Sequence, residues 1–178
     1  MSTWMRVLAT FRCYPLSPES GMRPEKWVER TFGKECVFPV QPEGGWGDAR
    51  NKDAFDAAMN EYRKRWSEYV EHNDRFLPMG SEGSCEVRYF AMDPISDPAY
   101  LVTVWGDLRD RDASDFGSVR AWFDRCVSKC NIIDAVCHVR GWPDKSETFE
   151  CHDKSEYDEE NDEQTPENGD NQKEQQAR

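Results

Sequence analysis

The chain has 178 residues, which suits one domain, or one domain with a tail. Its 35 acidic and 23 basic residues give a net charge of −12, but residues 144–178 hold 13 acids and 4 bases, a net −9. The remaining 22 acids and 19 bases leave residues 1–143 at −3. Because residues 1–143 are nearly balanced in charge, they do not form a strongly acidic domain that repels or imitates nucleic acid. Any long-range electrostatic attraction of a partner comes mainly from residues 144–178.

Residues 144–178 are predicted to be an acidic, disordered tail, because almost no apolar side chain follows Tyr157. Residues 1–143 are predicted to form the folded domain. The seven cysteines are odd in number and scattered, and Arg6 interrupts the only N-terminal stretch that could resemble a secretory signal. We therefore expect reduced thiols and a cytoplasmic location. We expect no membrane partner, because no apolar stretch is long enough to span a membrane.

The first half of the domain contains one clear strand and one clear helix. Residues 5–13 alternate between apolar and polar positions, as in a half-buried strand. Residues 14–52 form an irregular insertion, in which residues 25–32 favour a short helix after Pro24 and residues 36–40 a short strand. Apolar residues from Phe55 to Val70 then recur at helical spacing and predict the first main helix.

The second half predicts three strands and a helix. Residues 85–92 and 100–106 favour strands that are joined by a proline-containing turn. A helix is expected over residues 115–129, and residues 132–140 alternate as a last strand. The order β–α–β–β–α–β predicts an α+β domain with a ferredoxin-like fold, in which two helices cover one face of a four-stranded antiparallel sheet.

Metal binding and catalysis are disfavoured by the motifs. Cys126 and Cys130 share a helix face, and two Cys-His pairs follow, but no spacing matches a zinc ribbon or finger. Buried thiols explain these cysteines better. None of the three histidines lies in a nucleophile signature, and the Gly80–Ser84 stretch precedes a strand rather than a helix. We therefore expect no cofactor, no metal site and no catalytic residue.

The outward face of the predicted sheet carries the most suggestive pattern. It combines arginine with aromatic residues, which can stack bases or anchor a protein partner. The insertion could also cover this face, with Trp27, Phe32, Val37 and Trp46 as a lid. An acidic cluster follows the third strand; it is explained best by helix capping, although it could hold a cation. The residues that we expect to contact a partner are Arg6, Arg88, Trp105, Asp110 and Asp112.

Three stretches carry a resemblance: FLPMGSEGSCEV, VTVWGDLRD and RAWFDRC…NIIDAVCHV. Over roughly residues 53–140 they look like small uncharacterised proteins of phages and integrative elements of gut bacteria. Some small proteins of such elements are anti-CRISPR inhibitors, so the resemblance implies a non-enzymatic inhibitor that blocks a host defence nuclease. It assigns no functional residue.

Three functions follow as expectations. The first is a non-enzymatic interaction protein that binds a host protein, such as a nucleic-acid-handling defence complex. The second is a module that binds single-stranded nucleic acid through Arg6, Arg88 and Trp105. The third is a small enzyme with a Cys/His metal site. The sequence is also compatible with a homo-oligomer.

Overall fold

A computed structural model describes residues 2–16, 22–36, 49–81, 83–92 and 99–153. The helices are α1 (Pro24–Phe32), α2 (Lys52–Glu71) and α3 (Phe116–Val127), with short 3-10 turns at Ala49–Asn51, Asn73–Arg75 and Ala113–Asp115. The strands are β1 (Trp4–Pro15), β2 (Met79–Gly80), β3 (Gly83–Ser84), β4 (Glu86–Ala91), β5 (Tyr100–Arg109), β6 (Cys130–Gly141) and β7 (Lys145–His152). In the described part, no helix is both long and apolar enough to span a membrane.

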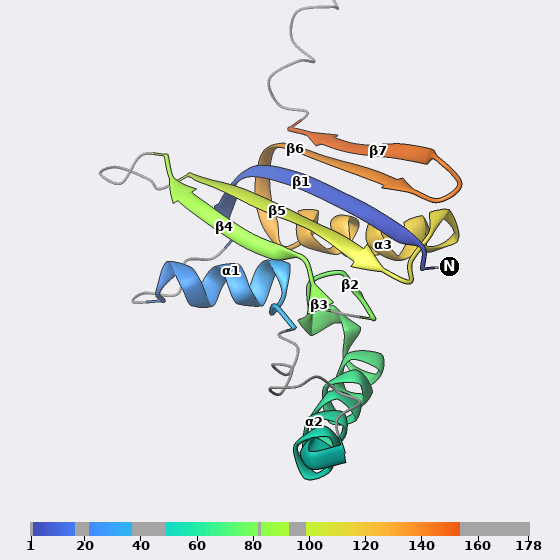
Figure 1. Cartoon of the computed structure of the whole chain (residues 1–178). Coiled ribbons are helices and arrows are strands. Elements are labelled where there is room, and N and C mark those ends of the chain that lie inside the picture. The colour runs from blue at the N-terminus through green and yellow to red at the C-terminus, as the bar shows by residue number, and fades with distance from the viewer. Residues whose placement is uncertain (1, 17–21, 37–48, 82, 93–98, 154–178) are drawn as a thin grey trace, which may run out of the picture.

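Five strands form one antiparallel sheet in the order β4-β5-β1-β6-β7 (Figure 1). Strand β1 is central and pairs with β5 from Trp4 opposite Arg109 to Cys13 opposite Tyr100. On its other side β1 pairs with β6, with one register shift between Arg12 and Cys13. The expected α+β class and the four expected strands are confirmed.

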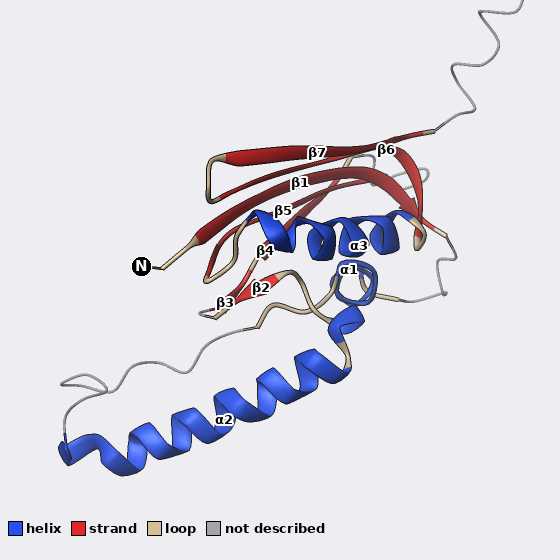
Figure 2. Ribbon diagram, turned by 90° about the vertical axis from the view of Figure 1, so that its right-hand side faces the viewer, coloured by secondary structure: helices blue, strands red, loops and turns tan. Residues whose placement is uncertain are grey.

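Helices α1 and α3 lie on the same face of the sheet (Figure 2). The β1 side chains that point toward them are at most 1% exposed, because the period of two puts every second residue on that face. Phe11 lies at the centre, with its ring 4.9 Å from Phe32 of α1 and 5.3 Å from Phe123 of α3. The indole N–H of Trp122 donates a 2.8 Å hydrogen bond to the Phe32 carbonyl and so joins the two helices.

Helix α1 begins and ends as its residues predict. Pro24 occupies the first turn, and Gly33 ends the helix with φ of 109°. A side chain at Gly33 would collide with the backbone of Phe76 and Leu77, which pass directly beside it. The close approach places Lys34 next to Phe76 in a parallel bridge. The C-terminal end of α1 is thereby fixed beside the segment that follows α2.

Helix α2 forms where the spacing predicts, but it projects away from the sheet instead of covering it (Figure 2). Its apolar stripe is only half-buried, and Trp66 is exposed. The helix that covers the sheet in this half is α1, whose Trp27, Val28 and Phe32 are buried. The expectation that α2 packs on the sheet was wrong. The shorter apolar stripe of α1, inside the insertion, follows β1 more closely along the chain and covers the sheet instead.

The sheet has five strands, so the expected four-stranded ferredoxin-like sheet was wrong in this respect. The tail was predicted to begin at residue 144, but Lys145–His152 form β7, which pairs with β6. Phe149 packs in the core, with its ring 6.2 Å from the Phe123 ring. The sequence pattern does not reveal that this side chain is buried. The predicted disorder of residues 154–178 and most of the predicted strand at 36–40 lie outside the described residues.

Truncation of Phe149 tests whether β7 belongs to the domain. We expect Phe149→Ala to lower the free energy of unfolding by about 3 to 5 kcal/mol, because Phe149 is 3% exposed and its loss leaves a cavity. Ser146→Ala on the exposed side of β7 is the control and should change stability by less than about 0.5 kcal/mol. Urea unfolding measures both values. Equal, negligible effects would place β7 outside the cooperative unit.

Candidate functional site

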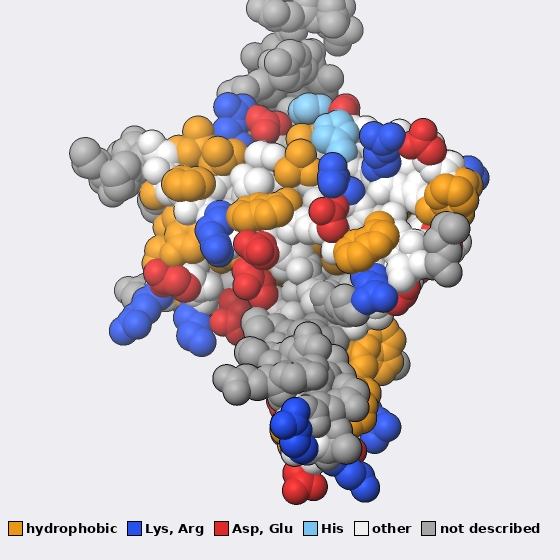
Figure 3. Space-filling model, viewed as in Figure 1, with side chains coloured by type: hydrophobic (Ala, Val, Ile, Leu, Met, Phe, Trp, Pro, Cys, Tyr) orange, Lys and Arg blue, Asp and Glu red, His pale blue; other side chains and the backbone are white. Residues whose placement is uncertain are grey.

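The face of the sheet opposite α1 and α3 carries no described element, and we call it the open face (Figure 3). Hydrophobic, basic and acidic side chains alternate over it. Leu8 is 46% exposed in the central strand, and Phe90 of β4 is 62% exposed. The outward side chains of the three central strands and β4 include Trp4, Arg6, Leu8, Thr10, Arg12, Glu86, Arg88, Phe90, Leu101, Thr103, Trp105, Asp107, Arg109, Asp134, Val136, His138 and Arg140.

Strand register sets which of these side chains are neighbours. Leu8 lies between Trp105 on β5 and His138 on β6. One residue pair further along, Arg6 lies between Asp107 and Arg140. Directly opposed side chains of antiparallel strands are in contact range, so aromatic, apolar and charged groups form successive rows across the sheet.

Each arginine of the open face is paired with a carboxylate. Arg6 Nε lies 2.9 Å from Asp107, and this pair raises the pKa of the Arg6 guanidinium. The other pairs are Arg12 with Asp134 at 2.6 Å, Arg140 with Asp144 at 2.6 Å, and Arg88 with Glu86 at 3.8 Å and Glu35 at 4.0 Å. Exposed pairs of this kind contribute little stability. Their main effect is that the open face has local charges but no strong excess of positive charge.

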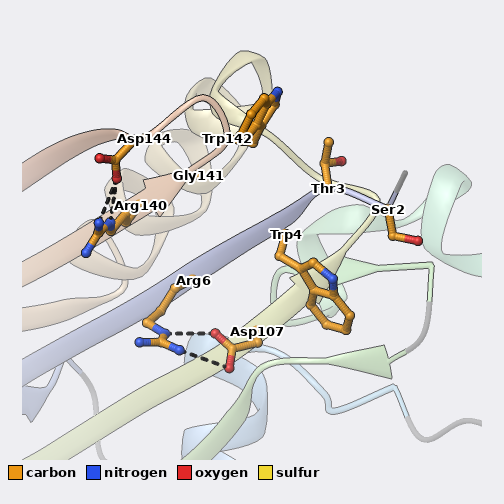
Figure 4. A pocket seen from close by; sticks show the side chains of 9 residues that line it. All are labelled: Ser2, Thr3, Trp4, Arg6, Asp107, Arg140, Gly141, Trp142 and Asp144. Atoms are coloured by element: carbon orange, nitrogen blue, oxygen red, sulfur yellow. Dashed lines mark hydrogen bonds and ion pairs between the residues drawn. The ribbon is translucent and has the colours of Figure 1, made fainter.

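A hollow of about 720 Å³ lies at the N-terminal end of β1 (Figure 4). Trp4 and Trp142, which are 51% and 61% exposed, flank it from β1 and from the turn that joins β6 to β7. The pairs Arg6–Asp107 and Arg140–Asp144 also line it. Two accessible indoles beside fixed charges offer a partner large apolar contact areas with polar groups at their rims.

A second hollow of about 490 Å³ borders the first, since both are lined by Arg6 and Asp107. Leu8, Trp105 and Glu86 form its other walls. The Arg88 guanidinium lies 5.9 Å from the centre of the Trp105 ring and covers one of its faces. We call the two adjoining hollows, from Trp142 and Trp4 to Trp105, the aromatic groove.

Three of the five expected contact residues come together on the open face. Arg6 and Trp105 line the same hollow, and Arg88 lies on Trp105. Trp4 and Trp142 were missed, although Trp4 continues the outward parity of Arg6 and could have been found by extending the predicted strand by one residue. Trp142 lies in a turn, where no alternation indicates its direction.

Asp110 and Asp112 lie beyond the end of β5, in the connection to α3. Asp110 has a φ of 58° and accepts a 2.6 Å hydrogen bond from the Ser81 hydroxyl. Asp112 forms a capping box with Asp115 and accepts hydrogen bonds from Ser114, which lower the pKa of its carboxyl. Both carboxylates therefore have roles in the turn, in line with the capping explanation of the acidic cluster.

The expected lid does not form from α1. Trp27 and Phe32 are buried on the helix-bearing side, where Trp27 packs 5.0 Å from Tyr100. Their side chains fill the space between α1 and the sheet, so they cannot reach the opposite face. The other two expected lid residues, Val37 and Trp46, lie outside the described residues.

The cysteines have the properties of core residues. None of the seven forms a disulfide, and all but Cys151 are buried. Burial raises the pKa of Cys137 to about 12 and also raises the pKa of Cys85 and Cys126. Within the described ranges, no three Cys, His, Asp or Glu side chains are grouped closely enough to hold a metal ion.

Comparison with known proteins gave no match to a family model, to a curated protein or to a solved structure. The functional argument therefore depends on the geometry and the chemistry of the open face.

Thiol reactivity tests this assignment of the cysteines. At pH 8, Ellman's reagent should react rapidly with Cys151 alone, because burial and a raised pKa keep groups such as Cys137 protonated and inaccessible. Reaction of the buried thiols should accelerate only as the pH rises well above the ordinary thiol pKa, or on unfolding. Cys151→Ser should remove the rapid phase and Cys36→Ser should retain it. A rapid phase that persists in Cys151→Ser would reveal an activated thiol.

Proposed function

We propose that this protein is a non-enzymatic interaction module that binds another protein through its open face. The observation that carries the proposal is the exposure of large apolar side chains on a strand face that no described element covers. Trp4 and Leu8 of β1, Phe90 of β4 and Met92 just after β4 are each between 46% and 62% exposed, and Trp142 adds a further exposed indole in the turn after β6. Several large exposed apolar side chains on one face, with charged side chains between them, suit an interaction site.

The residue types of the aromatic groove suit a protein interface. Tryptophan and arginine are enriched among the residues that dominate binding energy, particularly where neighbouring contacts exclude water. Here Trp4 and Trp142 offer anchors, and the paired Arg6 and Arg140 can exchange carboxylate partners with little cost because they remain solvated. A stable interface needs about 800 Å² from each partner, so the contact would extend from the groove across the sheet.

Single-stranded nucleic acid is the second candidate, and the contact of Arg88 with Trp105 favours it, since bases stack on such side chains. Affinity for a polyanion, however, requires cations that can neutralise phosphates. Asp107, Asp134 and Glu86 already neutralise the arginines of this face. A protein partner is therefore supported better than a nucleic acid.

The more specific proposal is that the partner belongs to a host defence system that handles nucleic acid. The resemblance to proteins of phages and integrative elements supports it. So does the charge of residues 154–178, a net −6, which complements the basic groove of a nuclease. In this proposal the open face docks on the partner, and the acidic segment accelerates encounter at low salt.

Substitutions on the open face test the proposal. The wild-type protein, the double variant Trp4→Ala/Leu8→Glu and the control Trp66→Ala, on the distant helix α2, would each be used to capture proteins from the organism that carries the gene. We expect a specific partner to bind the wild type and the control equally. The double variant should bind it about 30-fold or more weakly, because loss of an anchor costs about 2 kcal/mol or more.

Equal capture by all three proteins would contradict the proposal. A 20-residue oligothymidine separates the second candidate: binding that weakens with salt and disappears in Trp105→Ala would favour nucleic acid. Sedimentation of the purified protein as a dimer that Leu8→Glu dissociates would instead identify a second copy of the chain as the partner.

A further inference from the structure

A basic hollow lies on the opposite side of the molecule from the open face. Its volume is about 410 Å³, and α1, the Asn73–Arg75 turn and the end of the α3–β6 connection form its walls. Five basic and two acidic side chains line it, a net +3 in a chain of net −12. They are Lys26, Arg30, Lys34, Arg75 and Lys129, with Glu29 and Asp74. We call this surface the basic hollow.

The acidic side chains that line the basic hollow neutralise only part of its positive charge. The single carboxylate of Glu29 serves two ammonium groups, those of Lys26 and Lys34, each at 3.7 Å. Across the part of the chain that the structure describes, neither Arg75 nor Lys129 forms an ion pair. This contrasts with the open face, where every arginine has its own acid. The hollow therefore attracts a negatively charged ligand.

The C-terminal segment leaves the sheet near this hollow. At the end of β7, His152 pairs with Asp134, and the Asp153 N–H donates a 3.0 Å hydrogen bond to the Ile133 carbonyl. Lys129, which lines the hollow, precedes Ile133 by four residues, a separation of about 13 Å along a strand. The segment thus starts within reach of the hollow.

Residues 154–178 have the charge and the length to occupy it. They contain nine acidic and three basic residues, a net −6. The acidic run from Asp158 to Glu163 lies five to ten residues beyond Asp153. Extended chain of that length spans about 17 to 34 Å, more than the distance estimated from Ile133 to Lys129. Because the segment is tethered, its effective concentration at the hollow reaches the millimolar range, which suffices for a weak ionic contact.

We propose that the acidic segment 154–178 binds in cis to the basic hollow. The contact neutralises the hollow in the isolated protein and is weakened by salt. A partner with a stronger basic groove competes for the same segment, so that binding of the partner uncovers the hollow. The contact in cis stands apart from the proposed function, because it concerns the helix-bearing side and needs no partner; only the competition rests on the proposed function.

Amide NMR spectra of the full chain test this contact. Raising NaCl from 50 to 500 mM should shift the backbone amides of Lys26, Lys34 and Lys129 in the wild type. In the variant Glu159→Gln/Glu160→Gln/Asp162→Asn/Glu163→Gln these amides should already lie near their high-salt positions at 50 mM, with a salt response at least about threefold smaller. The amide of Thr10, on the open face, serves as the reference and should be the same in both proteins.

A synthetic peptide of residues 154–178, added to the neutralised variant, should move the three amides back toward their wild-type positions. Lys26→Gln/Lys129→Gln should abolish that effect. Identical spectra and identical salt responses of the wild type and the neutralised variant would overturn the proposal. Equal shifts of both proteins with millimolar inorganic phosphate, and none with the peptide, would also overturn it, by showing a general anion site.

Discussion

The one-sided burial of the central strand β1 determines the rest of the molecule. Its inward side chains, Met5 to Cys13, are sealed between the sheet and two helices, and its outward side chains must then point away from the core. Because β1 lies in the middle of five strands, a shift of one residue would expose Phe11 and bury Arg6 and Arg12. The register of β5 and β6 is fixed by the same requirement, and with it the aromatic groove.

This constraint separates two surfaces of different chemistry. The open face combines exposed tryptophan, leucine and phenylalanine with arginines that carboxylates already neutralise. The helix-bearing side has a hollow with a net positive charge, close to the start of an acidic segment. The first surface suits a protein with an apolar contact area and the second suits an anion. The two can therefore act at the same time or be coupled through the acidic segment.

The predicted elements show which physical signals the sequence displays. The four strands with clear alternation were found, and Arg6, Arg88 and Trp105 were placed on one face by parity alone. Strand β7 was missed because Phe149 and Cys151 are its only apolar residues, too few to reveal a period of two. The stripe of α2 indicated a helix correctly, but periodicity does not say which surface a helix covers. Trp142 could not be placed because a turn has no repeating geometry.

Hydroxyl-radical footprinting read by mass spectrometry tests the central claim most directly, because it measures the solvent access of individual side chains in the whole protein. If the open face is uncovered, Trp4, Leu8 and Phe90 should be oxidised at rates near those of the unfolded chain, while Phe11 and Phe123 should be protected at least about tenfold. Protection of Leu8 and Phe90 to the level of Phe11 would show that another part of the chain or a second copy covers this face, and would contradict the account.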